Sequence, residues 1–249
     1  MDLLELIIEY HKDNDRQGPG SEEATLKALS YLPHLDVNTK ILDIGCGTGG
    51  QTLTLAKNTK AQITAVDILP EFLGKLWQRA EENNVSSRIS AIRMSMDNLE
   101  FEENTFDLIW SEGAIYNIGF AKGLSLWRKH LKDNGYIAVS EISWLTDSRP
   151  REIEEYWISA YGEIDTIDAK LSVIDKSGYT PIANFVLEER CWMDYYRPLL
   201  AYAEAFLKKY DYADEVKVFV EETVEEAELY HRFKDYYSYV FYISRKTES

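Results

Sequence analysis

A glycine-rich turn places the strongest constraint on how this chain folds. Residues 41–50 read Ile-Leu-Asp-Ile-Gly-Cys-Gly-Thr-Gly-Gly. A short apolar strand over residues 40–44 runs into these glycines and then into a helical pattern over residues 51–57. Glycines let the backbone turn sharply and let a ligand approach it closely. The free N–H groups that begin the helix favour a carboxylate or a phosphate. The turn therefore predicts a nucleotide-cofactor site.

The glycines fit two overlapping patterns, which point to different cofactors. Gly45, Gly47 and Gly50 match the dinucleotide pattern G-x-G-x-x-G. Asp67 follows about 20 residues later, where that pattern expects an acid for the ribose hydroxyls. This pattern predicts a nicotinamide-dependent oxidoreductase. A glycine turn that binds no ligand is a further alternative.

In the second pattern Gly49 is the third glycine, and Asp43 stands before the loop. Residues 43–49 then resemble the first motif of the class I S-adenosylmethionine (SAM) dependent methyltransferases, in particular those that act on small molecules. SAM carries an ammonium group that a carboxylate at Asp43 can receive, directly or through water. The pyrophosphate of a dinucleotide would be repelled there. The acid therefore favours a methyltransferase over an oxidoreductase.

Strand and helix patterns alternate along the chain, which predicts an α/β fold with a doubly wound, mostly parallel sheet. The expected strands are residues 40–44, 62–66, 88–94, 105–110, 136–142, 182–189 and 237–244. The expected helices are residues 2–12, 21–32, 51–57, 70–83, 120–131, one within 148–162, and one that stops at Gly178. The resemblance implies a Rossmann-like seven-stranded sheet whose last strand is antiparallel.

We expect a single domain over residues 1–249, with two segments added to the sheet pattern. Residues 1–20 form a helix and a loop over the cofactor, and residues 192–233 form a helical lid insertion of two helices. Connections between consecutive elements are usually much shorter than the second segment. Extra elements past the strand ends commonly cover the substrate of an open α/β sheet. The expected aromatic walls of the substrate site are Tyr10, Trp144, Trp192, Tyr195 and Tyr196.

The resemblance implies roles for residues at the ends of the second and third strands. Asp67 would hold both ribose hydroxyls, because a carboxylate accepts two hydrogen bonds from a diol, although it could instead cap the next helix. Ile68 would lie against the adenine face. The adenine edge would meet Ser95, Met96 and Asp97, with the partner of its amino group left open between Ser95, Asp97 and the backbone. An ordinary turn is the plain alternative there.

The methionine end of the cofactor is expected at the glycine loop, with Gly45, Gly47 and Gly49 against it. Residues 17–20, Gln-Gly-Pro-Gly, resemble the loop that folds over this end in several branches of the family. Gln17 and Gly18 are therefore cofactor-binding candidates, although the segment also suits a plain turn between helices.

Catalysis by in-line methyl transfer requires a general base only if the nucleophile starts protonated. Glu112, at the end of the fourth strand, could face the sulfonium cation, the acceptor or a neighbouring helix. Glu112, His11, Tyr116 and Tyr195 are the candidates for a base. The sequence does not select nitrogen, oxygen, sulfur or carbon as the methylated atom.

Composition restricts the partners. The 249-residue chain has a formal net charge of −16, which opposes binding to nucleic acids and to anionic membranes. The two cysteines and four histidines show no metal-ligand spacing, and Cys46 within the loop fits a reducing compartment. No signal peptide or membrane span is evident, so we expect a cytoplasmic protein.

Together these features predict a SAM-dependent methyltransferase for a small-molecule acceptor, without metal, nucleic acid or membrane partners and with a homodimer possible. A non-catalytic SAM-binding regulator or subunit is the alternative.

Overall fold

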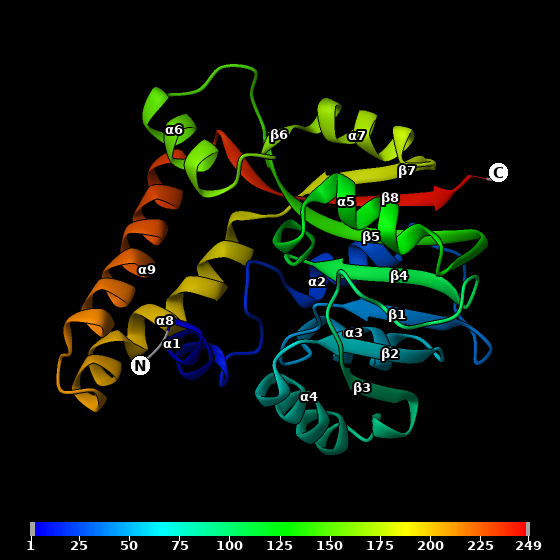
Figure 1. Cartoon of the computed structure of the whole chain (residues 1–249), viewed down its shortest axis with the longest axis horizontal. Coiled ribbons are helices and arrows are strands. Elements are labelled where there is room, and N and C mark those ends of the chain that lie inside the picture. The colour runs from blue at the N-terminus through cyan, green and yellow to red at the C-terminus, as the bar shows by residue number, and fades with distance from the viewer. Residues whose placement is uncertain (1–2, 248–249) are drawn as a thin grey trace.

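The computed structural model describes residues 3–247 and has a single mixed sheet with helices on both faces (Figure 1). The strands are β1 (Lys40–Ile44), β2 (Gln62–Asp67), β3 (Ile89–Arg93), β4 (Phe106–Glu112), β5 (Leu131–Trp144), β6 (Asp165–Thr166), β7 (Tyr179–Val186) and β8 (Tyr237–Lys246). The α-helices are α1 (Leu3–His11), α2 (Glu22–Leu29), α3 (Gly50–Asn58), α4 (Pro70–Glu82), α5 (Phe120–Arg128), α6 (Arg151–Ala160), α7 (Ile167–Lys176), α8 (Glu189–Lys209) and α9 (Asp214–Phe233). Two short 3₁₀ turns, η1 (Ser86–Arg88) and η2 (Ile115–Asn117), complete the set.

The sheet has the order β3-β2-β1-β4-β5-β8-β7. Strands β1 to β5 are parallel, and β8 runs antiparallel to both β5 and β7. The predicted seven-stranded doubly wound sheet is therefore confirmed, with the two-residue β6 added beside β5. Strand order reverses between β1 and β4, and ligands of open α/β sheets bind at such a switch point.

Two apolar cores, one on each face, hold the helices to the sheet. Side chains of α2, α3 and α4 pack on one face, and those of α5 and α7 pack on the other. Central strands are covered on both sides, so their residues are almost continuously apolar. Ile41, Leu42 and Ile44 of β1 are fully buried.

Two strands begin earlier than the sequence pattern suggested. β5 starts at Leu131, which pairs with Phe106, and an irregularity then shifts the register until Tyr136 pairs with Leu108. Asn134, within this irregularity, has φ +62°. Asparagine tolerates this left-handed conformation, and an Asn-Gly pair is therefore typical of a turn. β7 begins at Tyr179, directly after Gly178 at φ +82° ends α7.

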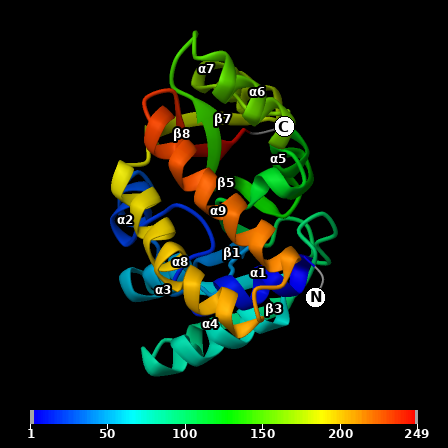
Figure 2. The same ribbon diagram turned by 90° about the vertical axis from the view of Figure 1, so that its left-hand side faces the viewer.

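Helices α1, α8 and α9 lie together beyond the carboxyl ends of the parallel strands (Figures 1 and 2). Leu6 and Tyr10 of α1 share a small apolar core with Leu199 and Phe206 of α8 and with Phe219 of α9. The Tyr10 hydroxyl donates to the Leu199 carbonyl at 2.6 Å. Two segments far apart in the sequence therefore form one helical layer over that edge of the sheet. Within residues 3–247, no helix combines the length and apolar character needed to cross a membrane.

Candidate functional site

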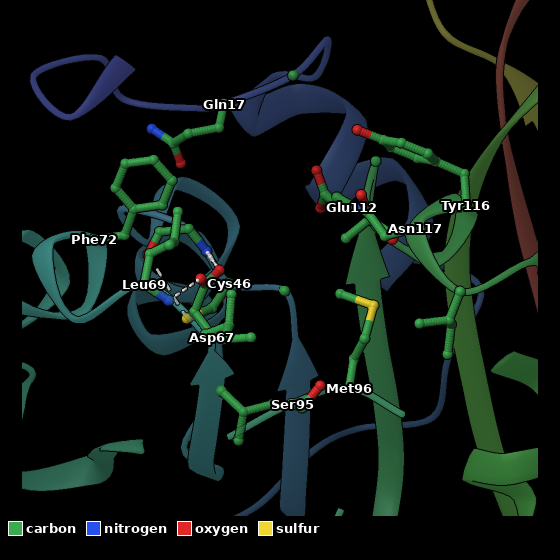
Figure 3. Close-up of a pocket in the computed structure, with 18 of the residues that line it drawn as sticks. Gln17, Cys46, Asp67, Leu69, Phe72, Ser95, Met96, Glu112, Tyr116 and Asn117 are labelled. Atoms are coloured by element: carbon green, nitrogen blue, oxygen red, sulfur yellow. Dashed lines mark hydrogen bonds between the residues drawn. The ribbon is translucent and has the colours of Figure 1, made fainter. Parts of the chain in front are cut away.

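A cavity of about 480 Å³ opens at the carboxyl ends of β1, β2 and β4. Its walls come from the glycine loop, from the ends of β2, β3 and β4, and from the N-terminal segment, which contributes Leu4, Ile7, Arg16, Gln17, Gly18 and Pro19. In Figure 3, Asp67, Leu69 and Phe72 lie on one side of this cavity, and Glu112, Tyr116 and Asn117 lie on the other. The volume suits a ligand of cofactor size.

The three loop glycines are required by the protein's own packing. Gly45, Gly47 and Gly49 have φ of +71°, +54° and +90°, a region that residues with a Cβ rarely occupy. A Cβ on Gly45 would lie 2.5 Å from the Cβ of Ala114. A Cβ on Gly49 would collide with Leu76 of α4. Neighbouring side chains, and not only a close ligand, therefore exclude residues larger than glycine at these loop positions.

Gln17 fastens the N-terminal loop to the glycine loop. Its Oε1 accepts from the Thr48 N–H at 2.8 Å, and its Nε2 donates to Thr48 Oγ1 at 2.9 Å. Gln17 and Gly18 both line the cavity. The sequence analysis expected these two residues over the cofactor, and their position is compatible with that role.

Asp67 joins the glycine loop to the end of β2. Oδ2 accepts from the Gly47 N–H and Oδ1 accepts from the Leu69 N–H, both at 2.9 Å. Burial raises the pKa of Asp67, against the lowering effect of these backbone donors. Each oxygen can accept a further hydrogen bond, and Asp67 lines the cavity. Ile68 beside it is 56% exposed, with its side chain available to a flat apolar ligand.

Ser95, Met96 and Asp97 line the same cavity after β3. The Ser95 hydroxyl donates to Asp97 Oδ1 at 2.6 Å, and this bond lowers the pKa of Asp97. The Met96 carbonyl accepts from Trp127 Nε1 at 2.7 Å, which fixes the turn. The choice between Ser95, Asp97 and the backbone as the partner of a ligand amino group remains open.

Glu112 lines the cavity but is fully engaged by other side chains. Its Oε2 accepts from Arg16 at 2.5 Å, and its Oε1 accepts from Thr25 Oγ1 at 2.7 Å and from Trp110 Nε1 at 2.8 Å. Because a cation and two donors hold the carboxylate, we regard Glu112 as a residue that fixes the cavity wall. Arg16 lines the cavity beside it. The sequence analysis did not select Arg16 as a site residue. The feature that could have indicated it is its position directly before Gln17.

The structure contradicts direct binding of a ligand by Asp43. The side chain is fully buried behind the loop and does not line the cavity. Its Oδ2 accepts from Thr52 Oγ1 at 2.5 Å, and its Oδ1 accepts from Gln51 Nε2 at 3.4 Å. Burial raises the pKa of Asp43 to about 7. The hydrogen bonds of Asp43 therefore hold α3 against β1. Gln51 lines the cavity, whereas Asp43 does not.

The four candidate bases are not brought together. Tyr116 lines the cavity with Glu112, whereas His11 and Tyr195 do not. His11 Nδ1 contacts the Ile7 carbonyl at 2.8 Å, and its Nε2 lies 3.3 Å from the Tyr195 hydroxyl. Burial lowers the pKa of His11 and raises that of Tyr195. No described geometry assigns either residue to proton transfer in the cavity.

The expected aromatic walls are mostly core. Trp192 is 1% exposed, stacks on Tyr230 at 4.2 Å between ring centroids, and donates to Ser238 Oγ at 2.9 Å. Tyr10, Trp144 and Tyr196 are also buried outside the cavity. The assignment of Trp192 to a substrate wall is wrong, because α8 turns this side chain toward β8 and α9. Helices α8 and α9 do not line the cavity; they support α1, which does.

Within residues 3–247 there is no group of acidic, histidine or cysteine side chains that could hold a metal ion.

Known proteins resemble this chain in sequence and in fold. Residues 41–135 match the family model described as a methyltransferase domain. The chain is 32% identical to the phosphoethanolamine N-methyltransferase of Plasmodium falciparum over 49% of its own length and 46% of the relative's. It is 28% identical to the sterol 24-C-methyltransferase of Kluyveromyces lactis over 61% of its length and 43% of the relative's. The matches therefore span less than half of either relative.

A solved structure extends the likeness to the whole fold. The SAM-dependent methyltransferase from Geobacter sulfurreducens, in complex with S-adenosyl-L-homocysteine, superposes with a TM-score of 0.85 at 17% identity, covering 98% of this chain and 99% of the other. The resemblance inferred from the glycine loop is therefore confirmed. Residues 41–135 match a methyltransferase domain, and the chain has the fold of this solved SAM-dependent methyltransferase.

Proposed function

We propose that this chain is an enzyme that transfers a methyl group from SAM to a small-molecule acceptor. The observation that carries the proposal is the cavity in which Asp67 and the glycine loop meet at the switch point of the sheet. A carboxylate with one free acceptor position on each oxygen is suited to the vicinal hydroxyls of a ribose.

The other walls of the cavity fit the remaining parts of SAM. Ile68 and Met96 offer apolar and polarizable surface for an adenine ring. Gln17, Gly18 and the glycine loop offer polar groups for the amino-acid end, and Arg16, which is paired with Glu112, lines the cavity beside them. When bound, SAM supplies a methyl group already activated by a sulfonium cation.

The protein's own contribution to methyl transfer is to orient the reactants and exclude water. Leu4 and Ile7 of α1 close one side of the cavity with apolar side chains. The Arg16–Glu112 ion pair fixes the end of β4 beside them. Tyr116 and Asn117 of η2 form the neighbouring wall, so the acceptor is expected between η2 and α1. No step here is assigned to a general base.

Two measurements test the proposal: ligand binding by the wild type and ligand binding by a variant of Asp67. S-adenosyl-L-homocysteine and SAM should each raise the melting temperature, since a ligand specific to the folded state stabilises it, and NAD should not. Asp67→Ala should lower the affinity for S-adenosyl-L-homocysteine by at least tenfold in isothermal titration, because a hydrogen bond to a charged group contributes about 1.5–3 kcal/mol. Asp36→Ala, which removes an exposed acid that does not line the cavity, is the control. Unchanged affinity in Asp67→Ala would remove the ribose assignment.

Turnover separates the enzyme from the alternative of a SAM-binding regulator. A screen of amine, hydroxyl, thiol and sterol acceptors should release S-adenosyl-L-homocysteine above the rate without acceptor. Tight cofactor binding with no turnover for any class would favour the regulator.

A further inference from the structure

A buried ion pair joins β5 to α7. Lys170 Nζ donates to Glu141 Oε1 at 2.7 Å, and the two side chains are 2% and 0% exposed. Glu141 lies near the carboxyl end of β5, and Lys170 lies in the first turn of α7. Neither side chain lines the cofactor cavity. The pair therefore belongs to the framework around the cavity and not to its surface.

The ion pair is poorly built for stability. Burying two charges is costly, and their attraction offsets this cost only if further hydrogen bonds satisfy both groups. Glu141 Oε1 accepts from Lys170 and from the Tyr161 hydroxyl, whereas the buried Oε2 accepts no hydrogen bond from residues 3–247. Two apolar side chains of similar volume are often at least as stable in such a place. The pair therefore requires an explanation other than stability.

Tyr161 connects the ion pair to the wall of the cavity. Its hydroxyl donates to Glu141 Oε1 at 2.7 Å. Its ring packs edge to face against the ring of Tyr116, with 6.0 Å between the ring centroids, an arrangement that aromatic pairs favour. Tyr116 belongs to η2 and lines the cavity on the side opposite Asp67 (Figure 3). Two successive contacts thus lead from the ion pair to the cavity.

Glu163 connects the ion pair to the turn that follows η2. Its backbone carbonyl accepts from Lys170 Nζ at 2.7 Å, and its Oε2 accepts from the Phe120 N–H at 2.9 Å. Gly119 has φ +92°, and a Cβ at this position would collide with the Glu163 carboxylate. The Lys170 ammonium also lies over the Phe120 ring, 4.7 Å from its centroid. Glu163 and Lys170 therefore lie directly against the turn between η2 and α5.

The two connections hold both ends of one short segment. Asn117 and Ile118 lie between them in the sequence, and both line the cavity. A 3₁₀ turn has poor hydrogen-bond geometry of its own, so the position of η2 depends on what packs against it. From this geometry, and resting on the proposed function, we propose that the Lys170–Glu141 pair positions η2 as the acceptor-facing wall of the cavity. Both are positioning residues, because they act through Tyr161 and Glu163.

A charged pair suits this task better than an apolar pair. Apolar contacts have no preferred direction, whereas each N–H of a lysine ammonium must point at an acceptor. Lys170 thereby fixes a carboxylate oxygen of Glu141 and the carbonyl of Glu163 at the same time. Without the pair, the Tyr161 hydroxyl and the Glu163 carbonyl would both lose these partners, and η2 would be free to shift.

A fluorine label on η2 tests the proposal. The full chain is prepared with 3-fluorotyrosine in place of Tyr116, and the ¹⁹F resonance is recorded with and without saturating S-adenosyl-L-homocysteine. Lys170→Met combined with Glu141→Leu removes both charges and keeps apolar volume in their place. The melting temperature of this double variant should stay within about 5 °C of that of wild type. Its ¹⁹F resonance should move or split by more than the wild-type linewidth.

Two tyrosine variants assign the effect to the ion-pair network. Tyr161→Phe removes only the hydroxyl that donates to Glu141, and it should also move the resonance. Tyr212→Phe is the matched control, because it removes a hydroxyl that donates to Glu204 at 2.8 Å between α8 and α9. This control should leave the resonance unchanged. If the double variant does not fold, the comparison of Tyr161→Phe with Tyr212→Phe decides the proposal.

Kinetics separate a positioning role from a merely structural one. With an acceptor found in the turnover screen, the double variant should raise the KM for the acceptor about fivefold or more and that for SAM less than about twofold, because only the acceptor wall is misplaced.

Three results would overturn the proposal. They are an unchanged resonance in both the double variant and Tyr161→Phe, an equal movement in Tyr212→Phe, or equal rises in the two KM values. Absence of turnover with every acceptor contradicts the proposed function instead, and the ¹⁹F spectra then still decide whether the ion pair positions η2.

Discussion

Asp43 and Asp67 are two acids near one loop, and the structure gives them different environments. Asp67 faces the cavity and holds backbone N–H groups of the loop. Asp43 lies behind the loop, where Thr52 and Gln51 donate to its carboxylate. At the residue scale, the direction of a side chain from its strand decides whether an acid contacts a ligand or supports the backbone that does.

The burial of Asp43 predicts a pH dependence of stability. Its pKa is about 7 in the folded protein against an ordinary value of 3.8, so the folded state keeps a proton that the unfolded chain loses as the pH rises above 4. The contribution of Asp43 to stability should therefore fall between about pH 4 and pH 7, at about 1.4 kcal/mol per pH unit, and stay constant above.

Asp43→Asn should remove this dependence. The free energy of unfolding in urea, relative to that of wild type, should rise by about 4 kcal/mol between pH 4 and pH 7. Glu71→Gln changes an exposed acid of α4. Its free energy of unfolding should vary with pH in parallel with that of wild type. Parallel curves for Asp43→Asn would show that Asp43 is already ionised in the folded protein at pH 4.

At the element scale, the first βα unit depends on how α3 and α4 pack around the glycine loop. Gly49 at φ +90° begins α3 and lies against Leu76 of α4, whereas Gly74 on α4 has no neighbour within 4 Å of its Cβ position. These two glycines therefore differ: packing requires Gly49, whereas the space around Gly74 would accept a larger residue.

The same substitution should therefore have opposite effects at these two positions. Gly49→Ala should destabilise the protein by about 2–4 kcal/mol, since it adds backbone strain and a clash. Gly74→Ala should stabilise it by about 0.5–1 kcal/mol, because alanine favours the helix. Chemical denaturation measures both. Similar effects at both positions would contradict the packing described for Gly49.

The element α8 also corrects a functional expectation, since Trp192 packs on Tyr230 and Ser238 rather than on a substrate. Trp192→Ala should cost about 3–5 kcal/mol of stability, as expected for a large buried side chain. Below its melting temperature, the variant should bind S-adenosyl-L-homocysteine as wild type does. Loss of acceptor turnover without loss of stability would restore the wall assignment.

At the scale of the whole molecule, α1, α8 and α9 form a layer beyond the carboxyl ends of the parallel strands (Figure 2). The formal net charge of −16 gives the protein an acidic surface. This surface repels polyanions and attracts cations.

The net charge also predicts that nucleic acids are not substrates. Fluorescence anisotropy with labelled DNA and RNA at physiological salt should show no submicromolar binding, because few phosphate contacts can release counterions. Binding that weakens steeply with added salt would contradict this prediction.

Much of the fold could be predicted because its determinants are local. The alternation of strands and helices, the loop after β1 and the acid at the end of β2 lie within residues 40–67 or repeat along the chain. Short connections between parallel strands bring their carboxyl ends to one edge. For this reason Asp67, Ile68, Ser95, Met96 and Asp97 could be proposed as neighbours, whereas Gln17 and Gly18 were proposed from the resemblance. All of these residues line one cavity. Their roles toward a cofactor stay predictions.

The tertiary structure alone decided which side chains meet across long sequence distances. Arg16 pairs with Glu112, 96 residues away, Trp192 packs against α9 and β8, and Tyr196 of α8 donates to Glu226 of α9. These contacts depend on how helices pack on the sheet, and side-chain packing is governed by shape and volume rather than by periodicity. The sequence by itself thus determined the sheet and the glycine loop, and packing decided which distant side chains contact one another around them.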